Sequence, residues 1–128
     1  MKYFIKTIPH KSQRYETCGD YYDGLFGVTH FRISKMDNPD YEFLISIHEQ
    51  IEHYLIQKRG LPISEIDAFD IMFEKEREAG LHTIDEEPGF DPRSPYLDEH
   101  AFATLIERQL ADKLQVDWQK YSDTVNNL

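Results

Sequence analysis

The residues best placed to do chemistry are His48 and Glu52, because they fall on the side of a predicted helix that should be buried. Residues 40–57 carry apolar side chains at helical spacing, which predicts an amphipathic helix; these are Leu44, Ile45, Ile47, Ile51, Tyr54, Leu55 and Ile56. At about 100° per residue, His48 and Glu52 lie within the apolar arc and one turn apart. A carboxylate in apolar surroundings is unstable without a cation or a donor beside it. We therefore expect another group to converge on this point.

A metal ion is the group that this pattern favours. Residues 48–52 read H-E-Q-I-E and differ from the zinc-hydrolase pattern H-E-x-x-H only at the last position. Zinc accepts imidazole nitrogens and carboxylate oxygens, and three protein ligands leave one position for water. We predict His48 and Glu52 as ligands and Glu49 as the general base that activates metal-bound water. The third ligand must come from another part of the chain, and the candidates, in order of preference, are His100, Asp70 and Glu107.

Other interpretations of these residues stay open. Glu52 could pair with an Arg or a His while His48 is a satisfied core histidine. A di-metal carboxylate site of helix-bundle type is a further option; it would use His48, Glu52, Asp70, His100 and Glu107. Two other histidines are not placed at the site, because His53 points away from the apolar face and is expected to be exposed, and His82 starts a loop.

The N-terminal residues 1–36 are predicted to be mainly β. Residues 2–8 and 25–34 are rich in β-branched and aromatic side chains, which is typical of strands. Residues 15–22 can supply a short third strand between turn-rich segments. We therefore expect a small antiparallel sheet, with His30 on a strand and His10 in a loop.

Residues 37–125 are predicted to be mainly α, in three or four helices. Gly60 ends the first helix, and Pro62 with Ser64 as N-cap opens a second, which ends near Gly80. Ser94 as N-cap and Pro95 at the first helical position open a third helix over residues 96–114. Within these two helices we expect nine apolar side chains in the core, namely Ile66, Phe69, Met72, Phe73, Phe102, Ala103, Ile106, Leu110 and Leu114. A short final helix should hold Trp118 and Tyr121.

The loop between the second and third helices spans residues 81–94 and contains E-P-G and D-P turns. Loops of this length in compact domains are often functional. We take its second part, residues 87–94, as a candidate lid over the metal site.

Length and composition narrow the class of protein. A chain of 128 residues with 40% hydrophobic residues predicts one domain with a real core. The net charge of −10 disfavours direct nucleic-acid binding, because phosphate contacts need Lys and Arg. No apolar run is long enough for a membrane span, and residues 1–6 do not form a signal peptide. The single Cys18 excludes an internal disulfide, so we expect a cytoplasmic protein.

Several short sequence blocks support a family resemblance over nearly the whole chain. They are Ile8-Pro9-His10, Gln13-Arg14-Tyr15, Gly19-Asp20, Phe31-Arg32-Ile33-Ser34, Ala68-Phe69-Asp70, Phe73-Glu74, Glu87-Pro88-Gly89-x-Asp91-Pro92, Pro95-Tyr96, His100, Ala103, Glu107-Arg108 and Val116-Asp117-Trp118-x-x-Tyr121. With these blocks the chain resembles a family of small, poorly characterised proteins encoded in bacteriophages and prophages. The resemblance implies that the H-E-x-x-E helix, the Pro-Gly loop and His100 belong to one unit. It implies no activity.

The sequence as a whole predicts an α+β protein, with a small N-terminal antiparallel sheet packed against three to four helices. We expect a metal-binding protein, with zinc as the favoured divalent ion, and a metal-dependent hydrolase of zincin-like chemistry. A peptide substrate is suggested only by analogy with H-E-x-x-H enzymes. The alternative is a non-catalytic acidic protein that blocks a basic host partner, with the His/Glu cluster structural. In that case salt dependence should be strong.

Overall fold

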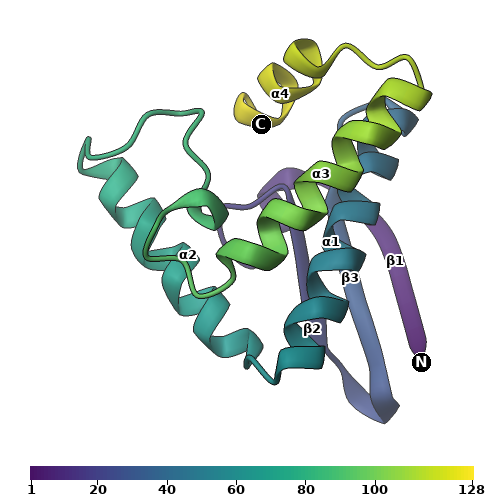
Figure 1. Ribbon diagram of the computed structural model, residues 1–128, viewed down its shortest axis with the longest axis vertical. Coiled ribbons are helices and arrows are strands. Elements are labelled where there is room, and N and C mark those ends of the chain that lie inside the picture. Colours follow the sequence, from purple (N-terminus) through teal and green to yellow (C-terminus); the bar gives the residue numbers. More distant parts are fainter.

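The computed structural model describes all 128 residues and confirms an α+β fold (Figure 1). Three strands come first and four helices follow. Their bounds are β1 Lys2–Ile8, β2 Gly19–Asp23, β3 Val28–Ser34, α1 Pro39–Arg59, α2 Ile63–Glu78, α3 Leu97–Lys113 and α4 Trp118–Asn126. Single 3-10 turns lie at His10–Ser12, Leu25–Gly27 and Pro88–Phe90. None of the helices combines the length and the apolar composition needed to cross a bilayer.

The sheet is mixed, so the expectation of a fully antiparallel sheet was wrong for one pair. The strand order is β1-β3-β2. β2 and β3 form an antiparallel hairpin, whereas β1 pairs with β3 in parallel, with Lys2 opposite Val28. The central position goes to β3 because it has the most side chains to bury: Phe31 and Ile33 are 0% and 1% exposed. Residues 9–18 carry the chain from β1 to the far edge of the sheet and leave this position free.

Helix α1 is buried on two sides, which explains why its apolar pattern alone was misleading. Its start is capped by the Asn38 side chain, which accepts hydrogen bonds from the backbone N–H groups of Asp40 and Tyr41. Gly60 ends it in the left-handed conformation at φ 79°, as predicted. One side of the helix packs on the sheet and another faces α3, which crosses it in Figure 1.

His53 lies on the sheet side of α1 and is 1% exposed, so the expectation of an exposed His53 was wrong. Its ring meets Tyr3, Tyr21 and Phe31 in edge-to-face contacts with centroids 5.3–6.2 Å apart. The prediction assumed one buried apolar face per helix, so it could not anticipate a buried polar ring on a second face.

The apolar core consists of two clusters at opposite ends of α1. One contains Tyr21, Phe31, Ile56, Ile66 and Tyr96. The other contains Ile33, Leu44, Ile45, Ala111 and Tyr121. Along α1, residues 48–52 fall between the two clusters. The polar candidate site is therefore flanked by apolar packing at both ends.

The boundaries of α2 and α3 differ from the predicted ones. Pro62, not Ser64, precedes the first residue of α2, and Tyr96 precedes the first residue of α3. Ser94 still accepts a hydrogen bond from the Tyr96 backbone N–H at 3.2 Å, although it lies outside the helix.

Three side chains that we expected on buried helix faces are partly exposed: Tyr54 at 47%, Met72 at 39% and Phe102 at 49%. The reason in α3 is that its buried face is mainly polar or small, consisting of Glu99, His100, Ala103, Glu107 and Ala111. The most apolar side of α3 therefore does not face the core.

Candidate metal centre

Three side chains from α1 and α3 converge on one point between the two helices. His48, Glu52 and His100 are 5%, 4% and 8% exposed. The distances are 3.1 Å between His48 Nε2 and Glu52 Oε2, 3.1 Å between His48 Nε2 and His100 Nδ1, and 2.8 Å between His100 Nδ1 and Glu52 Oε2. Of the predicted third ligands, His100 is thus the one whose nitrogen meets the other two ligand atoms.

This triangle has dimensions close to those of one face of a tetrahedral metal site. Ligand atoms bound to zinc at about 2.0–2.2 Å stand about 3.3–3.5 Å apart. The observed separations of 2.8–3.1 Å would need to widen by only a few tenths of an ångström. A tetrahedral ion held by these three atoms would keep its fourth position free. The buried His-Glu-His group could therefore hold a divalent metal.

His48 and Glu52 are each held by a further hydrogen bond outside the triangle. His48 Nδ1 lies 2.7 Å from Glu107 Oε1, and the Tyr121 hydroxyl donates to Glu107 Oε2. Glu52 Oε1 accepts a hydrogen bond of 2.8 Å from the Tyr21 hydroxyl. Carboxylates behind ligand histidines are typical of metal sites, because they fix the ring and increase its basicity. Glu107, the third-ranked ligand candidate, thus supports His48 and does not join the triangle.

His100 is fixed mainly by the loop that precedes α3. Glu87 Oε1 lies at an ion-pair distance of 3.4 Å from His100 Nε2, and this buried nitrogen has no hydrogen-bond partner. A Cβ atom on Gly89 would come within 2.3 Å of the His100 ring, so only glycine fits here. The Phe90 ring meets the same imidazole edge-on at 4.6 Å.

Carboxylates around the triad raise the pKa of both of its imidazoles. Burial opposes the charged form of His48, but hydrogen bonds to Glu107 and Glu52 raise its pKa well above the usual value. Burial also opposes the charged form of His100, but Glu52 and Glu87 raise its pKa to about 9. Burial also acts to raise the pKa of Glu52, yet its contacts with His100 and His48 lower that pKa. The carboxylates around the triad therefore favour a positive charge at this point.

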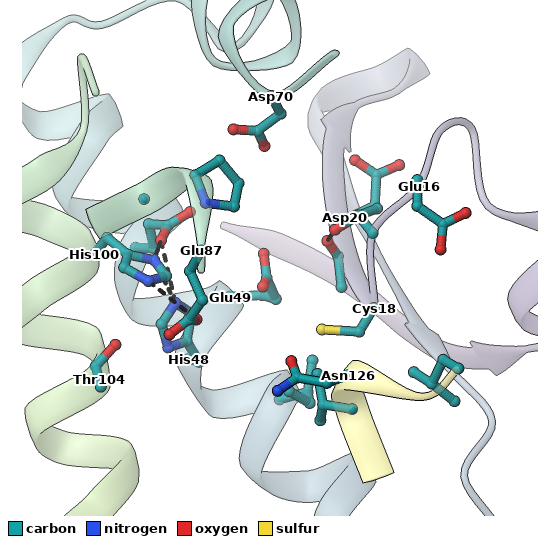
Figure 2. A pocket seen from close by; sticks show the side chains of 18 of the residues that line it. Glu16, Cys18, Asp20, His48, Glu49, Asp70, Glu87, His100, Thr104 and Asn126 are labelled. Atoms are coloured by element: carbon teal, nitrogen blue, oxygen red, sulfur yellow. Dashed lines mark hydrogen bonds and ion pairs between the residues drawn. The ribbon is translucent and has the colours of Figure 1, made fainter. Parts of the chain in front are cut away.

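Glu49 differs from the other carboxylates near the site because no hydrogen bond or ion pair engages it. Its side chain points into the pocket between His48 and the segment that carries Cys18 and Asp20 (Figure 2). It packs on Gly19, where an added Cβ would lie 2.6 Å from Glu49 Oε1. Burial and the charge of Glu52 raise the pKa of Glu49 to about 8. A carboxylate with such a pKa exchanges protons near neutral pH.

Asp70 points into the same pocket from α2 but lies outside the ligand triangle (Figure 2). Its two oxygens accept hydrogen bonds from Tyr96 at 2.6 Å and Tyr15 at 3.2 Å. Burial raises the pKa of Asp70 to about 7. Both oxygens of Asp70 are therefore engaged by tyrosine hydroxyls. The structure has one ligand triangle, and Asp70 is not available as a ligand for a second metal.

The pocket above the triad has a volume of about 420 Å³. His48, Glu52 and His100 form one wall, and Glu49, Cys18 and Gly19 line the side toward β2. Val125 and Asn126 of α4 also line the pocket. Cys18 is a free thiol. This space is large enough for a small ligand group to reach the triad.

The remaining histidines lie away from the triad. His10 contacts Ser34 and Glu16. His30 lies on β3 beside Phe4 and Tyr22, and His82 stacks on Phe73.

Sequence reasoning missed three supporting residues of the site. Tyr21 and Tyr121 carry no spacing signal, because they come from a strand and from α4. Glu87 belongs to the E-P-G turn. This turn singled out the loop but did not indicate that Glu87 contacts His100.

Comparisons with protein-family models, with curated proteins and with solved structures found no match. The geometry of the site therefore carries the functional argument.

Proposed function

We propose that the protein is a metal-dependent hydrolase of zincin-like chemistry, with zinc held by His48, Glu52 and His100. The observation that carries this proposal is the buried triangle of ligand atoms, with Glu107 hydrogen-bonded behind His48 and the Glu87 carboxylate 3.4 Å from His100 Nε2. A site of this kind with three protein ligands leaves a position for water or substrate. Zinc in such a site lowers the pKa of a water molecule to about 7 and polarises a carbonyl.

Glu49 is the general base in this proposal. It follows His48 directly, as the base does in the H-E-x-x-H pattern, and it has no partner that would hold its carboxylate elsewhere. The pocket beside it gives a substrate access to both Glu49 and the triad. Glu52 in place of a second histidine makes the ligand set more negative than that of H-E-x-x-H enzymes.

The resemblance to phage and prophage proteins remains a prediction, and so does the substrate. A peptide bond is our first candidate by analogy with the H-E-x-x-H pattern, and an ester is the simplest surrogate for it.

Metal content and turnover together test the proposal. Tag-free protein purified without chelator is analysed by elemental mass spectrometry beside His48→Ala. We expect about one zinc per chain in the wild type and none in the variant. Zinc-loaded protein is then assayed with p-nitrophenyl acetate and with a fluorogenic peptide library.

The decisive variant is Glu49→Gln. It should retain zinc and lose turnover by about 10²- to 10⁴-fold. Glu78→Gln is the matched control, because Glu78 is an exposed carboxylate at the end of α2 and undergoes the same change in charge. Wild-type protein without metal would refute the proposal. Full zinc occupancy with equal turnover in Glu49→Gln would leave a metal protein and remove the proposed base.

A further inference from the structure

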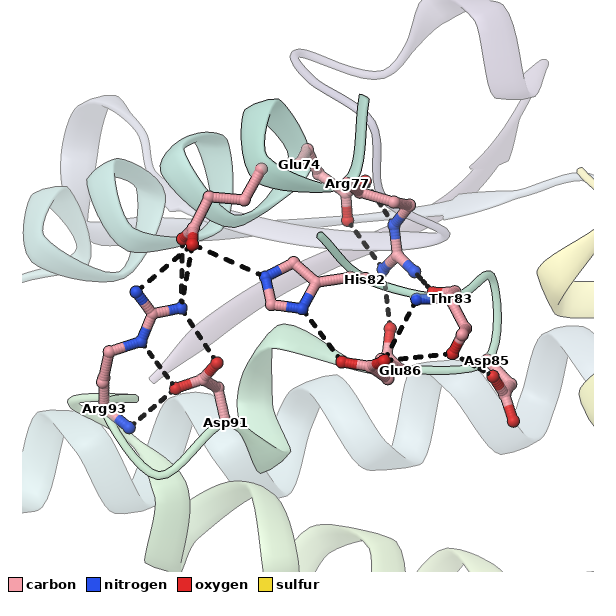
Figure 3. Close-up of polar contacts among 9 residues, drawn as sticks. Glu74, Arg77, His82, Thr83, Asp85, Glu86, Asp91 and Arg93 are labelled. Carbon is pink, nitrogen blue, oxygen red and sulfur yellow. Dashed lines mark hydrogen bonds and ion pairs between the residues drawn. The ribbon is translucent and has the colours of Figure 1, made fainter. Parts of the chain in front are cut away.

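The loop that carries Glu87 and Gly89 is tied to α2 by a guanidinium group (Figure 3). Arg77, in the last turn of α2, donates hydrogen bonds to the backbone carbonyls of Thr83 and Glu86. It also pairs with Glu74 at 2.9 Å and lies over the Phe73 ring at 5.1 Å. One side chain therefore fixes two points of the loop backbone.

Two further contacts hold the loop on either side of the E-P-G turn. The His82 ring stacks on Phe73 with centroids 3.8 Å apart and contacts Glu86 at 2.9 Å. Beyond the turn, Arg93 bridges Asp91 at 2.9 Å and Glu76 of α2 at 3.0 Å. We call Arg77, His82 and Arg93 with these partners the α2 clamp. The loop is thus fastened to α2 on both sides of its E-P-G turn.

The segment between these two fastening points presses on His100. Gly89 packs against the face of the imidazole, Phe90 meets it edge-on, and the Glu87 carboxylate faces its Nε2 atom. The triad atom of the same ring is Nδ1, on its other side. The ring is therefore held between the loop and the triad.

We propose that the α2 clamp sets the position of His100 as third metal ligand, with Arg77, Glu87 and Gly89 as positioning residues. This inference rests on the proposed metal site. His48 and Glu52 are placed by one helix at a fixed spacing, whereas His100 comes from another helix and needs its ring rotation fixed separately. Support of this kind behind a ligand typically changes metal affinity by about 10- to 100-fold.

Cobalt(II) binding tests the clamp, because the visible spectrum of cobalt reports its coordination geometry. Arg77→Ala and Gly89→Ala should each bind cobalt about 10- to 100-fold more weakly than the wild type, with an altered absorption band. Glu87→Gln should weaken binding in the same direction. Arg77→Lys should not restore binding, because an ammonium cannot donate to two carbonyls and a carboxylate in the geometry of the guanidinium.

The matched control is Arg108→Ala. Arg108 lies on α3 and stacks on Trp118 at 4.7 Å, as Arg77 does on Phe73, but it does not contact the loop. Its cobalt affinity and spectrum should equal those of the wild type. Circular dichroism verifies that each variant is folded, and if Arg77→Ala is not, Arg77→Lys and Glu87→Gln carry the comparison.

The possible failures are distinguishable. Wild-type protein that takes up no cobalt overturns the metal site and the clamp with it. If the wild type binds cobalt and the folded Arg77, Glu87 and Gly89 variants show the same dissociation constant and spectrum, the clamp alone is overturned.

Discussion

Replacing Glu107 with glutamine isolates the contribution of the carboxylate behind His48. Glu107 Oε1 lies 2.7 Å from His48 Nδ1, and Tyr121 holds the other oxygen. The glutamine amide has nearly the same shape. Its oxygen can still accept the hydrogen bond from Nδ1, and its NH2 group can donate to the Tyr121 hydroxyl, which then accepts in place of donating. The variant therefore changes charge more than geometry.

The expected magnitude follows from the strength of that hydrogen bond. A bond to a charged acceptor contributes about 1.5–3 kcal/mol, and a neutral bond contributes about half as much. Glu107→Gln should therefore weaken zinc binding by about 0.75–1.5 kcal/mol, roughly a 4- to 13-fold rise in Kd. This agrees with the lower end of the range known for outer partners of ligand histidines.

The measurement is a competition titration of zinc against a chelating dye at pH 7.5, at constant ionic strength. Asp112→Asn serves as control, because this exposed residue is also on α3 and loses the same charge. A Kd for Glu107→Gln within a factor of two of the wild type would refute the carboxylate–histidine reasoning. A similar weakening in Asp112→Asn would show that net charge, and not the contact, is responsible.

Two further predictions concern stability. Because burial raises the pKa of Asp70 to about 7, its stabilising contribution is complete below about pH 4 and is lost as the pH rises through 7. Asp70→Asn should thus be roughly 4 kcal/mol more stable than the wild type at pH 8, and similar to it at pH 4, in urea unfolding. The same difference at both pH values would contradict this. Free zinc at 100 times its Kd should stabilise the wild type by about 2.7 kcal/mol. A zinc-dependent rise in Tm that persists in His48→Ala would place the ion elsewhere.

The sequence predicted those features of the fold that depend on residues close together in the chain. Helix α1 and its end at Gly60 follow from apolar spacing and from a residue that tolerates positive φ. The strands follow from β-branched and aromatic enrichment. The pairing of β1 with β3 did not follow, because parallel and antiparallel neighbours place the same side chains in the core.

The burial errors have a common cause. His53 and Phe102 were assigned by assuming one apolar face per helix, whereas the polar site takes up core space that apolar side chains would otherwise fill. A helix with two buried sides, or with a buried polar side, cannot be recognised from its periodicity alone.

In the candidate site too, some features follow from the local sequence and others only from the tertiary structure. The sequence by itself determined that His48 and Glu52 share a surface, because residues four apart on a helix always do, and that Glu49 lies beside them. Only the tertiary structure decided that His100 completes the triangle, that Glu107 stands behind His48, and that Asp70 pairs with tyrosines. These residues are 14 to 59 positions apart in the pairs concerned. Contacts over such separations are set by how α1, α2 and α3 pack, which no local spacing specifies.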